Sequence, residues 1–186
     1  MTTNNKIELM APAGNFESLQ AALDNGCDSV YFGVEQLNMR ARASVNFTMD
    51  DLAEIAKRCE AKNVRSYLTL NTIIYDHDLS VVKTLINKAK EANITAVIAS
   101  DQAVIAMARS VGMEVHISTQ LNVTNIETIK FYSLFADTMV LSRELSLRQV
   151  KKITEQIEKE QIKGPNGNLV EIEIFGHGAL CMSVSG

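Results

Sequence analysis

Residues 94–118 read ITAVIASDQAVIAMARSVGMEVHIS, and this stretch decides the fold class. Its apolar run at 96–99 predicts a buried strand, and the apolar residues that recur at i, i+3, i+4 and i+7 from Val104 predict a helix. Gly112 then offers a left-handed residue, which ends a helix at little cost. A second strand is predicted over 114–118. A strand, a helix and a strand in this order are typical of a parallel sheet.

The same alternation continues along the rest of the chain. Seven strands are predicted in all, at residues 7–10, 29–32, 65–70, 96–99, 114–118, 138–141 and 170–175. Helical spacing separates these strands six times, for example in the patterns that start at Leu52 and Val82. The chain is therefore predicted to be a repeated strand and helix protein of the α/β class.

Two kinds of polar signal mark the ends of the predicted helices. Thr124 with Glu127, and Ser146 with Gln149, fit a capping box, in which the hydroxyl accepts a bond from a backbone N–H and the third residue reaches back. Left-handed residues that end a helix are predicted at Asn25-Gly26, Asn63, Asn93 and Gly112. These signals fall where the strand and helix predictions meet, so they support the alternation.

Strict alternation predicts right-handed crossovers and either an open, doubly wound sheet or a closed barrel. Regular spacing, and the absence of a glycine-rich dinucleotide loop after the first predicted strand, favour a (β/α)8 barrel of the TIM type. Seven strands and six helices are one and a half units short of eight. We therefore expect an incomplete barrel that occupies residues 1–186 as a single domain, with the remaining unit after Gly186.

The composition is that of an ordinary globular protein, with 46% hydrophobic and 22% charged residues in 186. No apolar run approaches the roughly 20 residues of a membrane helix, and the stretch MTTNNKIELM lacks the layout of a signal peptide. The predicted location is therefore the cytoplasm, with the three cysteines reduced. A formal net charge of -4 gives no general attraction to nucleic acid, so an RNA partner needs a local patch or another part of the protein.

In barrels of this type the reacting groups lie at the C-terminal ends of the strands. The polar residues that follow the predicted strands, or lie in the loop after the second strand, are Arg40, Arg42, Asn71, Asp101, Ser118, Gln120, Asn122, Arg143, Glu144, His177 and Cys181. The arginines present a planar fork suited to carboxylate or phosphate, although an ion pair with Glu35 or Glu144 is the alternative for one of them. His177 is favoured among the histidines because its flanking glycines let the backbone approach a ligand closely.

Simpler structural roles explain several other residues. Cys27 and Cys59 fit buried hydrophobic positions, and His116 lies in the middle of a predicted strand, where packing is favoured. For Cys181, a role in packing and a role as a ligand or reactive thiol are equally favoured. The chain has neither an H-E-x-x-H zinc pair nor a G-x-S-x-G nucleophile elbow. The residues alone therefore show no catalytic motif for peptide hydrolysis.

Six sequence blocks at the predicted strand ends resemble one family. They are IELMAPAG, DSVYFG with LNMRARA, LTLNT, HISTQLNVTN, LSRELSL and EIFGHGALCMSVSG, in chain order. Together they resemble the peptidase U32 family, also labelled collagenase-like proteases, over nearly the whole chain. The label implies a metal-dependent peptidase. Other members are hydroxylation factors, which the resemblance implies carry a [4Fe-4S] cluster on four cysteines.

For the hydroxylation factors, the resemblance implies a base in tRNA or rRNA, or an aromatic ring in quinone biosynthesis, as the substrate. It implies prephenate as the source of the hydroxyl group in the members that act on RNA. An anionic donor explains arginines at the active face, and a cluster explains a cysteine in a glycine-rich loop. An RNA-modifying hydroxylase is therefore the favoured prediction, and the RNA is expected to be held mainly by the rest of the protein.

The resemblance and the strand ends together give expected roles. Donor-binding residues are expected to be Arg40, Arg42, Asn71, Arg143 and Glu144. Catalytic or substrate-positioning residues are expected to be His177, Gln120 and Asn122, with Cys181 as one cluster ligand. The alternative is a peptidase acting on a protein substrate, with a divalent metal on His116, His177 and Asp101. A third possibility is a binding module whose catalytic power lies in a partner subunit.

Overall fold

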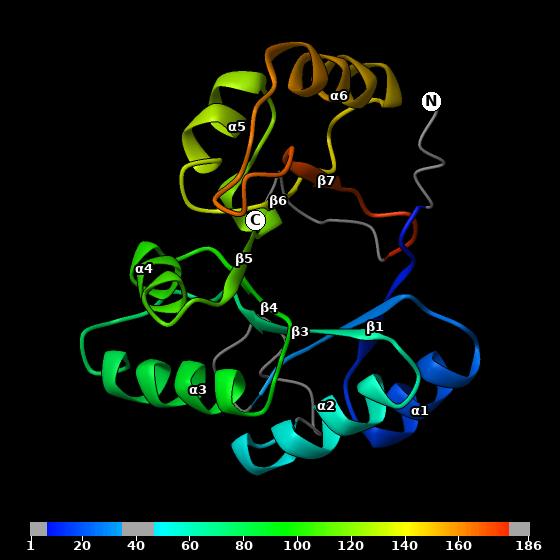
Figure 1. Cartoon of the computed structure of the whole chain (residues 1–186), viewed down its shortest axis with the longest axis vertical. Helices are drawn as coiled ribbons and strands as arrows, with labels where there is room; N and C mark the ends of the chain where they lie inside the picture. The colour runs from blue at the N-terminus through cyan, green and yellow to red at the C-terminus, as the bar shows by residue number, and fades with distance from the viewer. Residues whose placement is uncertain (1–6, 35–46, 179–186) are drawn as a thin grey trace.

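The computed structural model describes residues 7–34 and 47–178, which form a curved parallel sheet with helices on its outer face (Figure 1). The sheet has seven strands that lie side by side in chain order, and every neighbouring pair is parallel. The strands are β1 (Met10–Ala13), β2 (Ser29–Phe32), β3 (Arg65–Leu70), β4 (Ala96–Ala99), β5 (Glu114–Ile117), β6 (Thr138–Val140) and β7 (Glu171–Glu173). This incomplete, TIM-like barrel confirms the predicted fold class.

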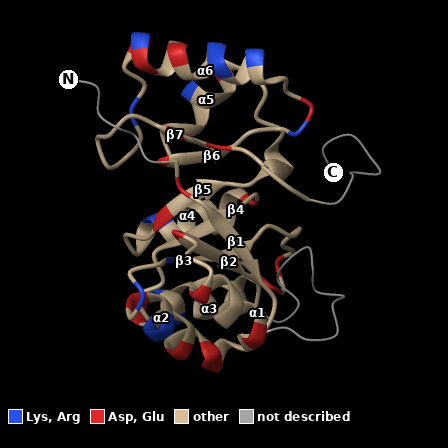
Figure 2. Cartoon of the chain, turned by 90° about the vertical axis from the view of Figure 1, so that its right-hand side faces the viewer, with Lys and Arg blue, Asp and Glu red and all other residues tan. Residues whose placement is uncertain are grey.

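Six α-helices connect the strands in the described part of the chain, as the sequence predicts. They are α1 (Phe16–Asp24), α2 (Leu52–Glu60), α3 (Leu79–Glu91), α4 (Gln102–Ser110), α5 (Ile126–Tyr132) and α6 (Leu147–Glu160), with short 3-10 turns at η1 (Met49–Asp51) and η2 (Thr119–Leu121). Both basic and acidic residues lie along α6 (Figure 2), which fits the solvent-facing side of a helix. None of the described helices is long and apolar enough to cross a membrane.

The prediction for the first strand is wrong in its position. A strand was expected at residues 7–10, whereas β1 pairs Met10 with Ser29 and continues through Pro12 to Ala13. A proline has no N–H for the ladder, so it normally ends a strand prediction. Pro12 is tolerated here because, among the described strands, β1 pairs with β2 alone and its other edge needs no donor.

The helix ends follow the predicted signals with one exception. The capping box of Ser146 and Gln149 opens α6 as expected. At α5 the predicted box is wrong, because Asn125 is the N-cap and its Oδ1 accepts from the backbone N–H of Thr128 at 3.0 Å. Asparagine caps a helix as well as threonine does, so the two neighbouring candidates could not be separated by residue type. Left-handed backbone occurs at the predicted positions, with positive φ at Gly26, Asn63, Asn93 and Gly112.

The main hydrophobic core lies between the sheet and the helices. Alternate strand residues face this core and are at most 1% exposed, including Val30, Leu68, Val97, Val115 and Met139. Burying a side chain of this size contributes about 1.5–3 kcal/mol, so this layer supplies much of the drive for folding. Cys27 and Cys59 lie in the same core, as predicted from the sequence.

The inner face of the sheet is built differently. Tyr67, Ala96 and Ile98 form a small apolar cluster there. His116 is also nearly completely buried, at 3% exposed, and so is Ser29 at 0%. The polar groups of His116 and Ser29 are therefore removed from water, which makes their hydrogen-bond partners important.

Gly164→Ala is expected to lower the free energy of unfolding by about 1–3 kcal/mol, the usual cost of forcing extra atoms into a packed site. A Cβ at Gly164 would lie 2.5 Å from Asp137 Oδ1 and 2.8 Å from Asp137 Cα. Asp137 cannot move away freely, because its Oδ1 accepts from the backbone N–H of Asn166 at 2.8 Å. Gly14→Ala is the matched control, since a Cβ there meets nothing within 4 Å. Equal urea midpoints for the two variants would contradict this expectation.

Candidate functional site

Two cavities lie at the C-terminal ends of the strands. The larger has a volume of about 360 Å³ and lies beside the end of β7 and the connection from β6 to α6. The smaller has a volume of about 60 Å³ and lies against the inner face of the sheet. Phe175 lines both cavities, so its ring is a shared wall. Parallel strands bring their C-terminal ends to one edge, which is why residues far apart in sequence meet here.

The larger cavity combines a cation, an aromatic ring and an imidazole. Arg143 lies over the ring of Phe175, with 4.3 Å between the guanidinium carbon and the ring centroid. His177 and Ser142 also line the cavity, and Leu141 belongs to its apolar wall. A guanidinium binds carboxylate or phosphate, while the aromatic and apolar groups suit a flat ring. The cavity is therefore suited to a small anionic ligand that contains a ring.

The smaller cavity is lined by polar groups from three strand ends. Thr69 and Asn71 come from the end of β3, Ser118 follows β5, and Glu173 ends β7. Asn71 Nδ2 donates to Ser118 Oγ at 3.4 Å, which is a long bond. Burial raises the pKa of the Glu173 carboxyl, and the neighbouring His116 opposes that rise.

His116 is buried, as the sequence predicts, and it lies between two carboxylates. Its Nε2 is 3.1 Å from Glu114 Oε1, and its Nδ1 is 4.0 Å from Glu173 Oε2. The hydrogen bond with His116 lowers the pKa of Glu114, so the Glu114 carboxylate accepts and Nε2 donates. In the neutral imidazole this assignment leaves Nδ1 as an acceptor that faces Glu173. The ring also lies against Tyr67, with centroids 4.6 Å apart.

A second polar network anchors the N-terminal part of the inner face. Tyr67 Oη donates to Glu8 Oε1 at 2.8 Å, and Glu8 forms an ion pair with Arg65. Burial is the main cause of the raised pKa of the Tyr67 hydroxyl, so Tyr67 stays protonated and keeps its donor. This network holds the ring against which His116 packs.

The structure brings together some of the predicted site residues. Asn71 lines the smaller cavity, and Arg143 and His177 line the larger one. Gln120 lies in η2 and Asn122 ends it with a left-handed φ of 51°, but neither lines either of these cavities. Glu144 accepts a hydrogen bond from Ser142 and also lies outside both linings. The predictions for Arg40, Arg42 and Cys181 fall outside the described residues.

The predicted metal set of the peptidase alternative does not converge. Asp101 caps α4, where its Oδ1 accepts from the backbone N–H of Ala103 at 2.8 Å. His116 is bonded to Glu114 on the inner face, and His177 lines the other cavity. Within residues 7–34 and 47–178, no three His, Cys, Asp or Glu side chains lie close enough together to hold a metal ion. The described geometry thus does not bring His116, His177 and Asp101 together, and a shared divalent ion on them stays a prediction.

The cavity residues missed from the sequence include Thr69, Glu173 and Phe175. The signal that locates them is strand alternation, because residues two apart on one strand point to the same face. Glu173 and Phe175 share that parity at the end of β7, and Thr69 shares it with Tyr67 on β3. Reading alternate positions as inner or outer would have placed all three on the inner face.

Comparison with known sequences identifies the family. Residues 14–186 match the family described as peptidase family U32. The chain belongs to this family. A protein named collagenase from Porphyromonas gingivalis strain W83 is 55% identical over 182 residues, which are 98% of this chain and 44% of that protein.

Other U32 relatives carry a different name. The tRNA hydroxylation protein P1 of Bacillus subtilis is 31% identical over 184 residues, covering 97% of this chain and 41% of that protein. The tRNA hydroxylation protein P of Helicobacter pylori strain 26695 is 34% identical over 185 residues, covering 98% of this chain and 42% of that protein. The chain thus spans less than half the length of these relatives.

Among solved structures, the U32 peptidase Mk0906 has a similar fold. It matches with a TM-score of 0.67 and 14% identity, covering 94% of this chain and 69% of that one. The tryptophan synthase α subunit of Legionella pneumophila matches with a TM-score of 0.57 and 19% identity, covering 93% of this chain and 74% of that one. At these identities the likeness supports the fold alone.

The two cysteines that the structure describes in this U32 chain are core residues, and neither is the expected ligand of the [4Fe-4S] cluster. Cys27 and Cys59 are buried in the core between the sheet and the helices, away from both cavity linings. Burial raises the pKa of the Cys59 thiol to about 11, whereas a cluster ligand is a thiolate. Cys181 lies outside the described residues. The cluster with Cys181 as one ligand therefore stays a prediction.

Glu173→Gln is expected to raise the free energy of unfolding at neutral pH. Burial raises the pKa of this carboxyl above its usual value of 4.5, so its contribution favours folding below pH 4.5 and is lost as pH rises through the folded-state pKa. Glutamine does not ionise, and its amide can donate to His116. The gain over the wild type should therefore be large at about pH 7.5 and small at about pH 4 in urea titrations.

The matched control for this change is Glu171→Gln, which alters an exposed carboxyl on the same strand. Its effect on the free energy of unfolding should vary less between the two pH values. A Glu173→Gln variant that is less stable than the wild type at about pH 7.5 would contradict the conclusion that burial disfavours the ionised form of Glu173.

Proposed function

We propose that the protein that carries this chain hydroxylates a base of tRNA or rRNA, and that a small anionic ring compound such as prephenate donates the hydroxyl group. The observation that carries the proposal is the larger cavity, where Arg143 lies over Phe175 beside His177. This arrangement suits an anionic ring better than an extended peptide. The U32 relatives named tRNA hydroxylation proteins cover nearly the whole chain and support the same choice.

The described residues take distinct roles in this proposal. Arg143 binds a carboxylate of the donor, and a hydrogen bond to a charged group of this kind contributes about 1.5–3 kcal/mol. Phe175 supports the ring of the donor, and His177 holds or moves a proton at the cavity. Asn71 positions the ligand from the neighbouring cavity. Roles for Arg40 and Arg42 in donor binding, and for Cys181 in ligating a [4Fe-4S] cluster, remain predictions.

The RNA is proposed to bind mainly outside this chain. The formal net charge is -4, and α6 carries acidic as well as basic residues (Figure 2). Such a surface gives little of the phosphate neutralisation on which RNA affinity depends. The proposal also implies a cytoplasmic protein, because its RNA substrate is made and used there.

The test is deletion of the gene that encodes this chain, followed by mass spectrometry of nucleosides from purified tRNA and rRNA. We expect one hydroxylated nucleoside to disappear and its counterpart with one oxygen fewer to accumulate. A plasmid copy of the wild-type gene should restore it. An unchanged nucleoside profile in both RNA fractions would overturn the proposal.

A second candidate function is a metal-dependent, collagenase-like peptidase. The 55% identity with the protein named collagenase favours it. The purified protein is therefore incubated with heat-denatured collagen, with and without a chelator. Cleavage that the chelator removes, together with an unchanged nucleoside profile in the deletion strain, would establish this function in place of RNA hydroxylation.

A further inference from the structure

Three buried polar atoms converge around the smaller cavity without a hydrogen-bond partner in the described part of the chain. They are Thr69 Oγ1, Glu173 Oε2 and His116 Nδ1. Thr69 and Glu173 line the cavity directly, and His116 lies behind Glu173 at 4.0 Å. Buried polar atoms in native proteins almost always have a partner, because each lone one costs about 1–3 kcal/mol. Thr69 and Glu173 bring two of them to the cavity, and the third, His116 Nδ1, faces Glu173 Oε2 from behind, so the cavity is suited to a polar group.

The hydrogen-bonding capacity of these atoms restricts the group that fits. A carboxylate of Glu173 can only accept, whereas the hydroxyl of Thr69 can donate as well as accept. An anionic group would be repelled by Glu173. An ammonium group could donate to Glu173 but has no lone pair for the hydroxyl hydrogen of Thr69. A hydroxyl group satisfies both atoms, because it donates to one and accepts from the other.

The size of the cavity limits the ligand further. A volume of about 60 Å³ holds a small polar end of a ligand rather than a whole ring. Phe175 separates this space from the larger cavity, where Arg143 is placed for a carboxylate. The two linings therefore suit a hydroxyl group in the smaller cavity and a carboxylate in the larger one.

We propose that Thr69 and Glu173 form a hydroxyl-binding subsite, which selects small ring carboxylates that carry a hydroxyl group at the far end. Thr69 donates to the hydroxyl oxygen, and Glu173 accepts the hydroxyl hydrogen. His116 is a positioning residue that packs behind Glu173 and is itself held by Glu114 and Tyr67. This proposal rests on the proposed function in one respect. The hydroxyl group that the subsite binds is taken to be that of the donor.

The test uses three matched monocarboxylates and the whole 186-residue chain. The compounds are 4-hydroxycyclohexanecarboxylate, cyclohexanecarboxylate and 4-aminocyclohexanecarboxylate. Binding is followed through the ¹³C-methyl NMR signals of Ile98 and Val140, which line the cavity. We expect the hydroxy compound to bind about five- to tenfold tighter than the other two, because one neutral hydrogen bond is worth about 1 kcal/mol.

Variants of Thr69 test the subsite without changing its charge. Thr69→Val keeps the shape and removes the hydroxyl, so the preference for the hydroxy compound over the amino compound, which can also donate to Glu173, should fall below about twofold, while Thr69→Ser should restore it. Ser29→Ala is the control, because it removes another buried hydroxyl that lacks a partner among the described residues but does not line the cavity. It should leave the preference unchanged, and the methyl spectrum of each variant shows whether it is folded.

Several outcomes would overturn the subsite. They are equal binding of all three compounds, tighter binding of the amino compound, a preference that survives Thr69→Val, and no change at Ile98 or Val140 with any compound. These results are separable from the RNA test. A lost nucleoside with equal binding would overturn the subsite alone, whereas a clear hydroxyl preference with an unchanged nucleoside profile would overturn RNA hydroxylation alone.

Discussion

Phe32→Ala should lower the free energy of unfolding by about 3–5 kcal/mol, the typical cost of removing a buried aromatic side chain. Phe32 is 1% exposed in the core between the sheet and the helices. Its ring packs edge to face with Phe47 at a centroid distance of 5.7 Å, and Phe47 packs in the same way with Phe16 at 5.1 Å. The substitution thus removes a packed ring and one end of an aromatic row.

Urea denaturation followed by circular dichroism measures this effect. Phe131→Ala is the matched control, because Phe131 lies on α5 and is 58% exposed. Its truncation should change the free energy of unfolding by no more than about 0.5 kcal/mol. Similar midpoints for the two variants would show that Phe32 is not in a closely packed core. Since a whole domain is stable by about 5–15 kcal/mol, Phe32→Ala is also expected to lower the yield of folded protein.

Arg143→Gln should reduce RNA hydroxylation about 10- to 100-fold when the variant gene replaces the deleted one. Loss of a hydrogen bond to a charged group costs about 1.5–3 kcal/mol, and each 1.4 kcal/mol is a factor of ten in binding. Arg143→Lys keeps the positive charge but loses the planar fork that stacks on Phe175, so its activity should fall between that of the Arg143→Gln variant and that of the wild type. The readout is the fraction of hydroxylated nucleoside at a limiting level of protein.

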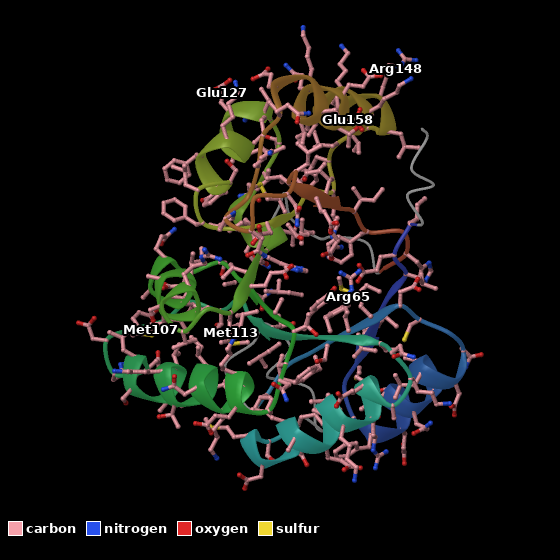
Figure 3. The ribbon with its side chains drawn as sticks, viewed as in Figure 1. Arg65, Met107, Met113, Glu127, Arg148 and Glu158 are labelled. Carbon is pink, nitrogen blue, oxygen red and sulfur yellow. The ribbon has the colours of Figure 1, made fainter. Side chains whose placement is uncertain are left out.

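Arg148→Gln is the matched control for charge. Arg148 is exposed on the outer surface of α6, where Figure 3 shows it away from the sheet. Full activity of Arg148→Gln together with a large loss in Arg143→Gln would tie the effect to the cavity. Full activity of Arg143→Gln would remove the observation on which the proposed function depends.

The fold was predictable because its signals are local and repeated. Each unit carries its own apolar strand, helical spacing and terminating residue, as Gly112 and Asn93 show. The errors occur where tertiary context decides between local options. Pro12 lies within β1 because that strand is at the edge of the described sheet, and Asn125 rather than Thr124 caps α5. The residue type alone decides neither whether Pro12 lies in a strand nor which residue caps α5.

The site was predictable only in part. The rule that reacting groups follow parallel strands led to Asn71, Arg143 and His177, which line the two cavities. It missed Glu173, because this residue lies within its strand and its importance comes from burial beside His116. Desolvation and the loss of hydrogen-bond partners arise only when distant segments pack together, so a linear sequence carries no direct sign of them.

The ring of Phe175 has a mechanical consequence. Because the same ring lines both cavities, a rotation about its χ1 angle would change the space in each of them. Occupancy of either cavity therefore biases the rotamer that the other one meets, and this linkage is reciprocal. A ligand long enough to reach past the ring would fix the rotamer itself, whereas two short ligands would compete for it. A single aromatic side chain can thus distinguish one extended molecule from two small ones.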